Sequence, residues 1–171
     1  MNKEEVINFI KNKNIWYESL EHKKVYTMEE LEKLNLPHKN SEAKNLFVRD
    51  DKKKNYYLII VSGTSKINLK EFSKKYNTRH LSFASEEDLM NILKLTKGSV
   101  SPLGILNDKN NLVKVFIDSY FINKENIIGV HPNDNTMTIW LRTNDLINII
   151  KEHGNIIQVV DVSVKSFVVK S

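Results

Sequence analysis

The chain has 171 residues, of which 40% are hydrophobic, and it carries a formal net charge of +5. This length and hydrophobic content are enough for one domain with a core of its own. No cysteine is present, which excludes disulfides, a thiolate nucleophile and cysteine-ligated zinc sites.

Helices and short strands alternate through the first half of the chain. Val6, Phe9 and Ile10 recur at helical spacing, and Thr27 stands three residues before Glu30, the spacing of a capping box. We expect helices at residues 4–12, 27–34 and 68–76, and strands at 16–20, 44–49, 56–61 and 79–83. The strands at 44–49 and 56–61 are separated by a charged turn, so they are predicted to pair as a hairpin.

The second half continues in the same way. Ser85 is expected to cap a helix with Leu89, Ile92 and Leu93 on its buried side, and Thr143 is expected to cap a later helix. Strands are predicted at 112–117, 127–130, 136–141 and 156–160. The pattern indicates an α+β (mixed α/β) domain with a mixed β-sheet flanked by helices over residues 1–160. Residues 161–171 are expected to be a tail, or a last edge strand.

One stretch, from Gly98 to Gly104, combines two of the five glycines with one of the three prolines. Glycine permits positive φ and a close approach to the backbone, whereas Pro102 fixes its own φ and restricts Ser101. The stretch therefore predicts a rigid loop whose main-chain groups face a small ligand. The plainer alternative is a sharp turn without a ligand.

Two further polar segments lie at strand edges. Lys44 and Asn45 open the strand at 44–49, and His131, Asp134 and Asn135 precede the strand at 136–141. A lysine at a strand edge and Asx residues before a strand are also common as ordinary surface and turn residues.

Two familiar chemistries fit these segments poorly. A serine nucleophile at Ser101 lacks the flanking glycines of a nucleophile elbow, because Ser99 and Leu103 occupy those positions. A metal site built from His131, Asp134 and Asp118 has no paired-histidine spacing to support it.

Taken together, in this order and spacing, the segments 44–50, 98–104 and 131–136 resemble those of the prolyl-tRNA editing proteins. These are free-standing relatives of the editing domain inserted in bacterial prolyl-tRNA synthetase. The likeness extends from about residue 4 to about residue 160. It implies the fold of the YbaK/prolyl-tRNA synthetase-associated domain, with a curved mixed sheet.

The resemblance also implies a mechanism that needs no nucleophilic side chain, no metal ion and no cofactor. The backbone of the G-x-x-x-P loop would hold the aminoacyl group and orient the attacking water, with help from the 2′-hydroxyl of the terminal adenosine. Lys44 would meet the terminal phosphate or ribose, and Asn45 would orient it. The residues implied to be catalytic are Lys44, Gly98, Ser99, Val100, Ser101 and Pro102.

The implied binding residues surround this loop. His131 would shape the aminoacyl pocket, and Asp134 and Asn135 would brace it, or would form a strand-entry turn without touching the substrate. The implied set is Asn45, Leu103, Gly104, His131, Asp134 and Asn135.

The resemblance therefore implies a trans-acting deacylase of mischarged tRNA(Pro), of the alanine-specific type, that excludes proline by size. Editing of serine or cysteine, and a noncatalytic tRNA-binding or regulatory module of the same fold, are the alternatives. The expected partners are the acceptor end of tRNA(Pro) and prolyl-tRNA synthetase. With no apolar run long enough to span a membrane, we expect a cytoplasmic monomer without a membrane partner.

Overall fold

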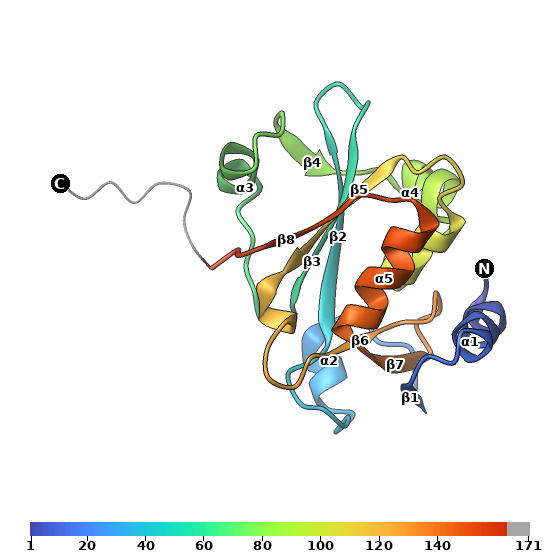
Figure 1. Ribbon diagram of the computed structural model, residues 1–171. Helices are drawn as coiled ribbons and strands as arrows, with labels where there is room; N and C mark the ends of the chain where they lie inside the picture. Colours follow the sequence, from blue (N-terminus) through green and yellow to red (C-terminus); the bar gives the residue numbers. More distant parts are fainter. Residues whose placement is uncertain (164–171) are drawn as a thin grey trace.

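The strands form two sheets in the computed structural model, which describes residues 1–163 (Figure 1). The larger sheet has the order β4-β2-β3-β5-β8, and the smaller has the order β1-β7-β6. The strands are β1 Tyr17–Glu21, β2 Ala43–Asp50, β3 Tyr56–Ser62, β4 Leu81–Phe83, β5 Val113–Asp118, β6 Ile127–Val130, β7 Met137–Arg142 and β8 Ile157–Val160. The α-helices are α1 Lys3–Asn12, α2 Met28–Glu32, α3 Leu69–Lys75, α4 Glu86–Leu93 and α5 Thr143–His153. Three 3-10 helices are η1 Lys97–Ser99, η2 Pro102–Asn107 and η3 Ser119–Phe121.

The larger sheet is mixed. β2 pairs antiparallel with β3 and β4, whereas β3, β5 and β8 run parallel to one another. The expected hairpin of β2 and β3 is confirmed, and the buried Asp50 holds its turn. The Asp50 carboxylate accepts from the backbone amides of Lys54 at 3.0 Å and Asn55 at 3.3 Å.

The central strand β3 separates two hydrophobic cores. Leu58 and Ile60 point into the larger core, whereas Ile59 and Val61 point into the smaller one. The larger core is covered by α1, α4, η2, α5 and the smaller sheet, and the smaller core is covered by α3 (Figure 1). This explains why β3 reads as a continuous apolar run.

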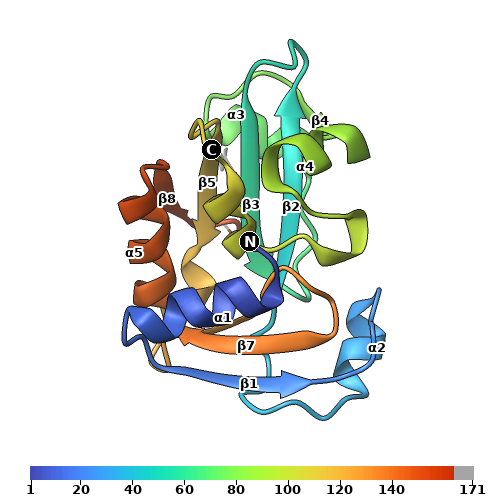
Figure 2. The same cartoon turned by 90° about the vertical axis from the view of Figure 1, so that its right-hand side faces the viewer.

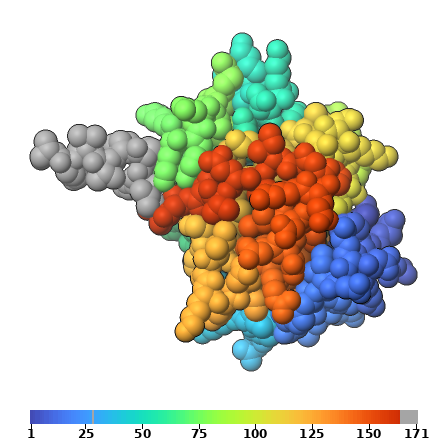
Figure 3. Space-filling view, viewed as in Figure 1, coloured from blue at the N-terminus to red at the C-terminus, as the bar shows by residue number. Residues whose placement is uncertain are grey.

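Two segments far apart in the sequence pair in the smaller sheet. Tyr17 pairs with Leu141, so β1 lies antiparallel to β7, and Figure 2 shows α1 running alongside β7. On the surface, α1 and α5 lie side by side on one face of the molecule (Figure 3). Within residues 1–163, none of the helices has the length and apolar character that crossing a bilayer requires.

Most of the expected helix starts are confirmed. The side chains of Thr27, Asn68 and Ser85 each accept a hydrogen bond from the third amide of the helix that follows. Thr143 is different, because it is the first residue of α5 and its hydroxyl donates to the carbonyl oxygen of Phe121 at 2.8 Å. It therefore ties the helix to η3 instead of capping it.

The mixed α/β class is confirmed, and the strands that the sequence pattern suggested for one sheet divide between two. Of the expected tail at residues 161–171, the structure describes only 161–163, which contain no strand. The remainder of the tail lies outside the described residues.

Candidate functional site

The three polar segments that the sequence singles out converge in the fold. The Asn45 side-chain amide donates to the carbonyl oxygen of Val100 at 3.4 Å, which joins β2 to the loop after α4. The hydroxyl of Ser101 donates to the carbonyl oxygen of His131 at 2.5 Å, which joins the same loop to the segment before β7. A side chain between His131 and Asp134, that of Asn133, donates to the Leu103 carbonyl at 3.4 Å.

The loop is helical at both ends. Gly98 and Ser99 belong to η1, and Pro102 opens η2, where its missing amide hydrogen costs nothing. Residues 98–100 are half-buried, whereas residues 101–105 are buried. Only the first half of the loop is therefore within reach of a substrate.

Both hydrogen-bonding functions of the Ser101 hydroxyl are used within the fold. Its side chain is fully buried, its hydroxyl donates to the His131 carbonyl, and its oxygen accepts from the amide of Leu103 at 3.2 Å. The alternative of Ser101 as an exposed nucleophile finds no support in this arrangement.

The two glycines of the loop are needed for space and not for their dihedral angles. In the described residues the glycine with positive φ is Gly154, so the positive φ that glycine permits is not used at Gly98 or Gly104. A Cβ atom on Gly104 would lie 2.6 Å from Leu95 Cδ1, and one on Gly98 would lie 3.0 Å from Tyr26 Cε1. Gly104 thus lets η2 pack on the end of α4, and Gly98 lets an aromatic ring lie against the loop.

His131 is held as a neutral imidazole. Its Nδ1 lies 2.9 Å from the carbonyl oxygen of Met137, which can only accept, so Nδ1 carries a proton, and in the neutral ring, which burial favours, Nε2 keeps its lone pair. Burial lowers the pKa of His131, more than the Met137 carbonyl raises it. His22 faces it with ring centroids 6.1 Å apart and contacts the Thr138 hydroxyl at 2.8 Å.

Asp134 and Asn135 both brace backbone. Asp134 accepts from the Thr136 amide at 2.9 Å and the Thr136 hydroxyl at 2.5 Å, and the hydroxyl bond is the main reason that the pKa of Asp134 is lowered. Asn135 is buried and pairs with both backbone groups of Val25, accepting from its amide at 3.4 Å and donating to its carbonyl. The segment before β7 therefore also fixes the chain ahead of α2.

Lys44 is separated from this cluster. Successive residues of a strand point to opposite faces, so Lys44 leaves β2 on the face opposite Asn45. Its ammonium donates to the carbonyl oxygen of Ser65. Burial, and then the nearby charge of Lys66, lower the pKa of Lys44.

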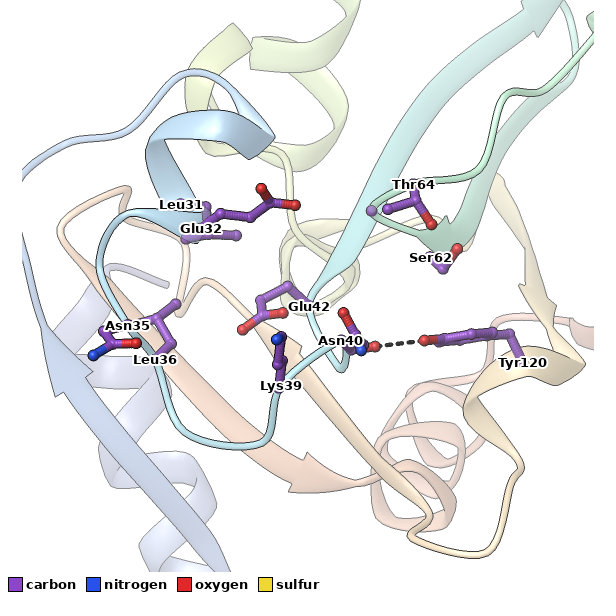
Figure 4. A pocket seen from close by; sticks show the side chains of 11 residues that line it. Leu31, Glu32, Asn35, Leu36, Lys39, Asn40, Glu42, Ser62, Thr64 and Tyr120 are labelled. Atoms are coloured by element: carbon purple, nitrogen blue, oxygen red, sulfur yellow. Dashed lines mark hydrogen bonds between the residues drawn. The ribbon is translucent and has the colours of Figure 1, made fainter.

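A cavity of about 760 Å³ is lined by residues that neighbour Lys44 and Ser65 along the chain (Figure 4). One wall is the turn at 62–64, which leads to Ser65, and another includes Glu42, two residues before Lys44. Burial raises the pKa of Glu42. Tyr120 reaches across one end of the cavity, where its hydroxyl donates to the carbonyl oxygen of Asn40 at 2.8 Å. The remaining lining residues are Leu31, Glu32, Asn35, Leu36 and Lys39.

The metal alternative gains no geometric support. Within residues 1–163 no three or more His, Cys, Asp or Glu side chains gather closely enough to hold a metal ion. Asp118, the third member of the suggested trio, instead lies at the end of β5, where it accepts from the amide of Val162 at 3.4 Å.

Sequence reasoning missed the neighbours that complete the cluster. Tyr26 touches Gly98 and His22 faces His131. Apart from that cluster, the Ser65 carbonyl accepts from the Lys44 ammonium. None of these residues belongs to a recognisable motif. The excess of turn residues around Ser65 was the only hint for that position.

Comparison with known families gives a match along most of the chain. Residues 22–149 match the aminoacyl-tRNA editing domain. The Prolyl-tRNA editing protein ProX of Acetoanaerobium sticklandii is 41% identical over 159 residues, which cover 93% of this chain and 96% of that protein. The Prolyl-tRNA synthetase associated domain-containing protein 1 of Mus musculus is 34% identical over 145 residues, covering 81% of this chain and 83% of the mouse protein.

Solved structures show the same fold at low sequence identity. A crystal structure of a proposed trans-editing enzyme for prolyl-tRNA synthetase superposes with a TM-score of 0.71, covering 95% of this chain and 97% of that one at 15% identity. A scaffold used for computational epitope grafting superposes with a TM-score of 0.73, also at 15% identity, covering 94% of this chain and 95% of the scaffold.

Proposed function

Because the chain belongs to the aminoacyl-tRNA editing domain family, and is therefore an aminoacyl-tRNA deacylase, we propose that it acts in trans on alanine esterified to tRNA(Pro). The relative that is named a prolyl-tRNA editing protein supports the choice of tRNA. The partners in this proposal are the acceptor end of tRNA(Pro) and, for its selection, prolyl-tRNA synthetase. The protein would work as a cytoplasmic monomer.

The observation that carries the proposal is the convergence of Asn45, the loop at 98–104 and the segment at 131–135. Hydrogen bonds from Asn45 to Val100 and from Ser101 to His131 hold the loop on both sides. A loop fixed in this way can present main-chain groups to an ester without reorganising when the reaction occurs.

The reaction needs little more than positioning, because the ester is already activated. Water adds to the ester carbonyl, the bond to the ribose oxygen breaks, and alanine and a free ribose hydroxyl are released. We assign the contact with the aminoacyl group to residues 98–100, the half-buried part of the loop. The buried part of the loop supports these three residues and is not expected to contact the substrate itself. It consists of Ser101, Pro102, Leu103 and Gly104.

His131 and its neighbours have a shaping role in this proposal. The neutral imidazole offers a lone pair at Nε2, which makes that wall of the pocket polar without adding charge. Asp134 and Asn135 hold the backbone around it. The 2′-hydroxyl of the terminal adenosine assists the attacking water.

Lys44 would meet the tRNA backbone from the face of β2 opposite the loop cluster. An ammonium has three donors, and the Ser65 carbonyl occupies one of them, so two remain for a phosphate or ribose oxygen. Its position away from the loop at 98–104 fits a charge that anchors the RNA rather than one that acts on the ester.

A panel of charged tRNA(Pro) substrates tests the proposal. Purified protein is incubated with tRNA(Pro) carrying alanine, serine, cysteine or proline, and release of each amino acid is timed. We expect alanine to be released fastest and proline to be retained, because the pocket excludes the larger ring. If serine or cysteine is released faster than alanine, that amino acid and not alanine is the preferred substrate. If the protein binds the tRNA but releases no amino acid, it is the noncatalytic module.

A further inference from the structure

Tyr26 is an exposed aromatic residue that folding does not explain. Its side chain is 70% exposed, although it follows the buried Val25 directly and lies just before α2. Exposing a large aromatic surface to water is unfavourable, and a partner that covers the ring gains binding free energy, because aromatic rings contribute much of the binding energy of interfaces.

The ring lies on the loop that the proposed function places against the ester. Atoms Cε1 and Cδ1 of Tyr26 lie 3.0 and 3.2 Å from the position that a Cβ atom on Gly98 would occupy. The absence of a side chain at residue 98 is what lets the ring approach so closely.

The backbone below the ring is fixed from both sides. The buried side chain of Asn135 pairs with the amide and the carbonyl of Val25, as a neighbouring strand would. On the other side, the Thr27 hydroxyl caps α2 by accepting from the Glu30 amide at 3.1 Å. Tyr26 is therefore presented on a held segment, and binding a flat partner would order little additional backbone.

Three exposed lysines lie near the ring along the chain or in the loop it contacts. Lys23 and Lys24 precede Tyr26 in the same segment, and Lys97 precedes Gly98 in the loop, all three exposed. An open aromatic face next to ammonium groups is the combination that binds unpaired nucleotides, since the ring stacks on a base and the cations attract the phosphates.

We propose that Tyr26 is the stacking platform for the terminal base of the tRNA acceptor end, the adenine whose ribose carries the aminoacyl ester. This inference rests on the proposed function, because it takes the loop at 98–100 as the place where the ester lies. A base attached to the same ribose must lie within one nucleotide of that loop, and the ring that touches Gly98 is within this reach. Asn135 then acts as a positioning residue for Tyr26.

Binding and hydrolysis are measured separately to test this assignment. An uncharged acceptor-stem RNA carries the fluorescent base 2-aminopurine in place of the terminal adenine, and quenching on addition of protein reports stacking. Deacylation of Ala-tRNA(Pro) gives KM and kcat. The variants are Tyr26→Ala, Tyr26→Phe and Phe83→Ala, the last as a control because Phe83 is also an exposed aromatic, 63% exposed, in β4.

We expect quenching with the unaltered protein, with Tyr26→Phe and with Phe83→Ala, and its loss with Tyr26→Ala. In the same variant KM should rise about 5- to 150-fold, the effect of losing one base stack, with a smaller change in kcat. Thermal unfolding of Tyr26→Ala should match that of the unaltered protein, because the ring is mostly in solvent.

If quenching persists in Tyr26→Ala, the ring does not stack on the terminal base and the proposal is overturned. A change in amino acid preference in this variant, together with persistent quenching, would show that the ring contacts the aminoacyl group instead. An equal loss in Tyr26→Phe would overturn it as well, since the hydroxyl and not the ring face would be responsible. Quenching without hydrolysis would support the stacking platform while contradicting the proposed function, so the two failures are distinguishable.

Discussion

At the scale of single residues, the ammonium of Lys44 is held at a cost to the fold. The Ser65 carbonyl accepts from its ammonium, while burial and Lys66 lower its pKa. A lowered lysine pKa means that the folded state disfavours the charge, so this residue does not stabilise the protein through its ammonium.

We predict that Lys44→Met lowers kcat/KM for deacylation about 10- to 100-fold, mainly by raising KM, because a charged donor that anchors the RNA is lost. The free energy of unfolding at neutral pH should stay the same or rise, because methionine keeps the apolar stem without the desolvated charge. Lys66→Met is the matched control, since Lys66 is the exposed neighbour that acts on Lys44 only through its charge. Equal losses of activity in the two variants would show that general positive charge, and not Lys44, attracts the RNA.

His131 predicts a pH dependence of stability. Its pKa is lowered in the fold by burial, against the Met137 carbonyl and Asp134, which raise it, and with His22 adding to the lowering. As the pH falls from 7.5, the unfolded chain binds a proton at its ordinary pKa of about 6.5 before the folded chain does. The free energy of unfolding should therefore decrease between this pH and the lower pKa of the folded state.

Chemical denaturation at pH 7.5 and 5.5 measures this decrease. The loss should be smaller in His131→Gln than in the unaltered protein. It should be unchanged in His80→Gln, which replaces an exposed histidine. A loss of the same size in all three proteins would contradict the assignment.

At the scale of elements, the contact between η2 and the end of α4 explains why residue 104 is a glycine. A methyl group there would lie 2.6 Å from Leu95 Cδ1 and 3.4 Å from Leu93 Cβ, and all three residues are buried. We predict that Gly104→Ala destabilises the protein by about 1–3 kcal/mol through overpacking.

The control is Gly98→Ala. There the new methyl group would meet the exposed Tyr26 ring, which can move aside, so stability should change little. Urea unfolding of both variants makes the comparison. A larger loss of stability in Gly98→Ala would contradict the packing argument.

Local patterns predicted most of these elements and some of the site. The hairpin of β2 and β3 follows from two apolar runs around a charged turn, and the caps at Thr27, Asn68 and Ser85 follow from side-chain spacing. The association of the three polar segments followed from family resemblance, and the structure brings Asn45, the loop and His131 together.

Features set by tertiary packing were not predictable in the same way. The division of the strands between two sheets depends on pairings such as Tyr17 with Leu141, which leave no local signal. The sequence shows that glycine permits positive φ in the loop, but not that the atoms packed closest to these positions belong to Leu95 and Tyr26. The alternation of side chains along a strand predicts that Lys44 and Asn45 lie on opposite faces of the sheet. Only the fold shows that the loop packs on the face of Asn45.

At the scale of the whole molecule, Ser41 joins the two sheets. It lies ahead of β2, its carbonyl accepts from the Gly129 amide of β6 at 2.8 Å, and its hydroxyl accepts from Trp140 Nε1 of β7 at 3.1 Å. The indole of Trp140 is fully buried beside Gly129, where a Cβ atom would lie 2.8 Å from Nε1.

We predict that Gly129→Ala destabilises the whole protein by about 1–3 kcal/mol, because the methyl group displaces the indole from Ser41. A shift of the tryptophan emission to longer wavelength should accompany the loss, since the displaced ring becomes more accessible to water. An unchanged spectrum together with unchanged stability would show that the joint tolerates the extra methyl group.

The pairing of β1 with β7 has a consequence for the order of events during translation. The ribosome releases residues 17–21 long before residues 137–141, so the first strand to emerge has no partner until most of the polypeptide has been made. The hairpin of β2 and β3 can close much earlier, because its strands are neighbours along the chain. A nascent chain that ends before residue 137 therefore leaves α1 and β1 without the surface that covers them, and only near the end of synthesis can the amino-terminal segment dock.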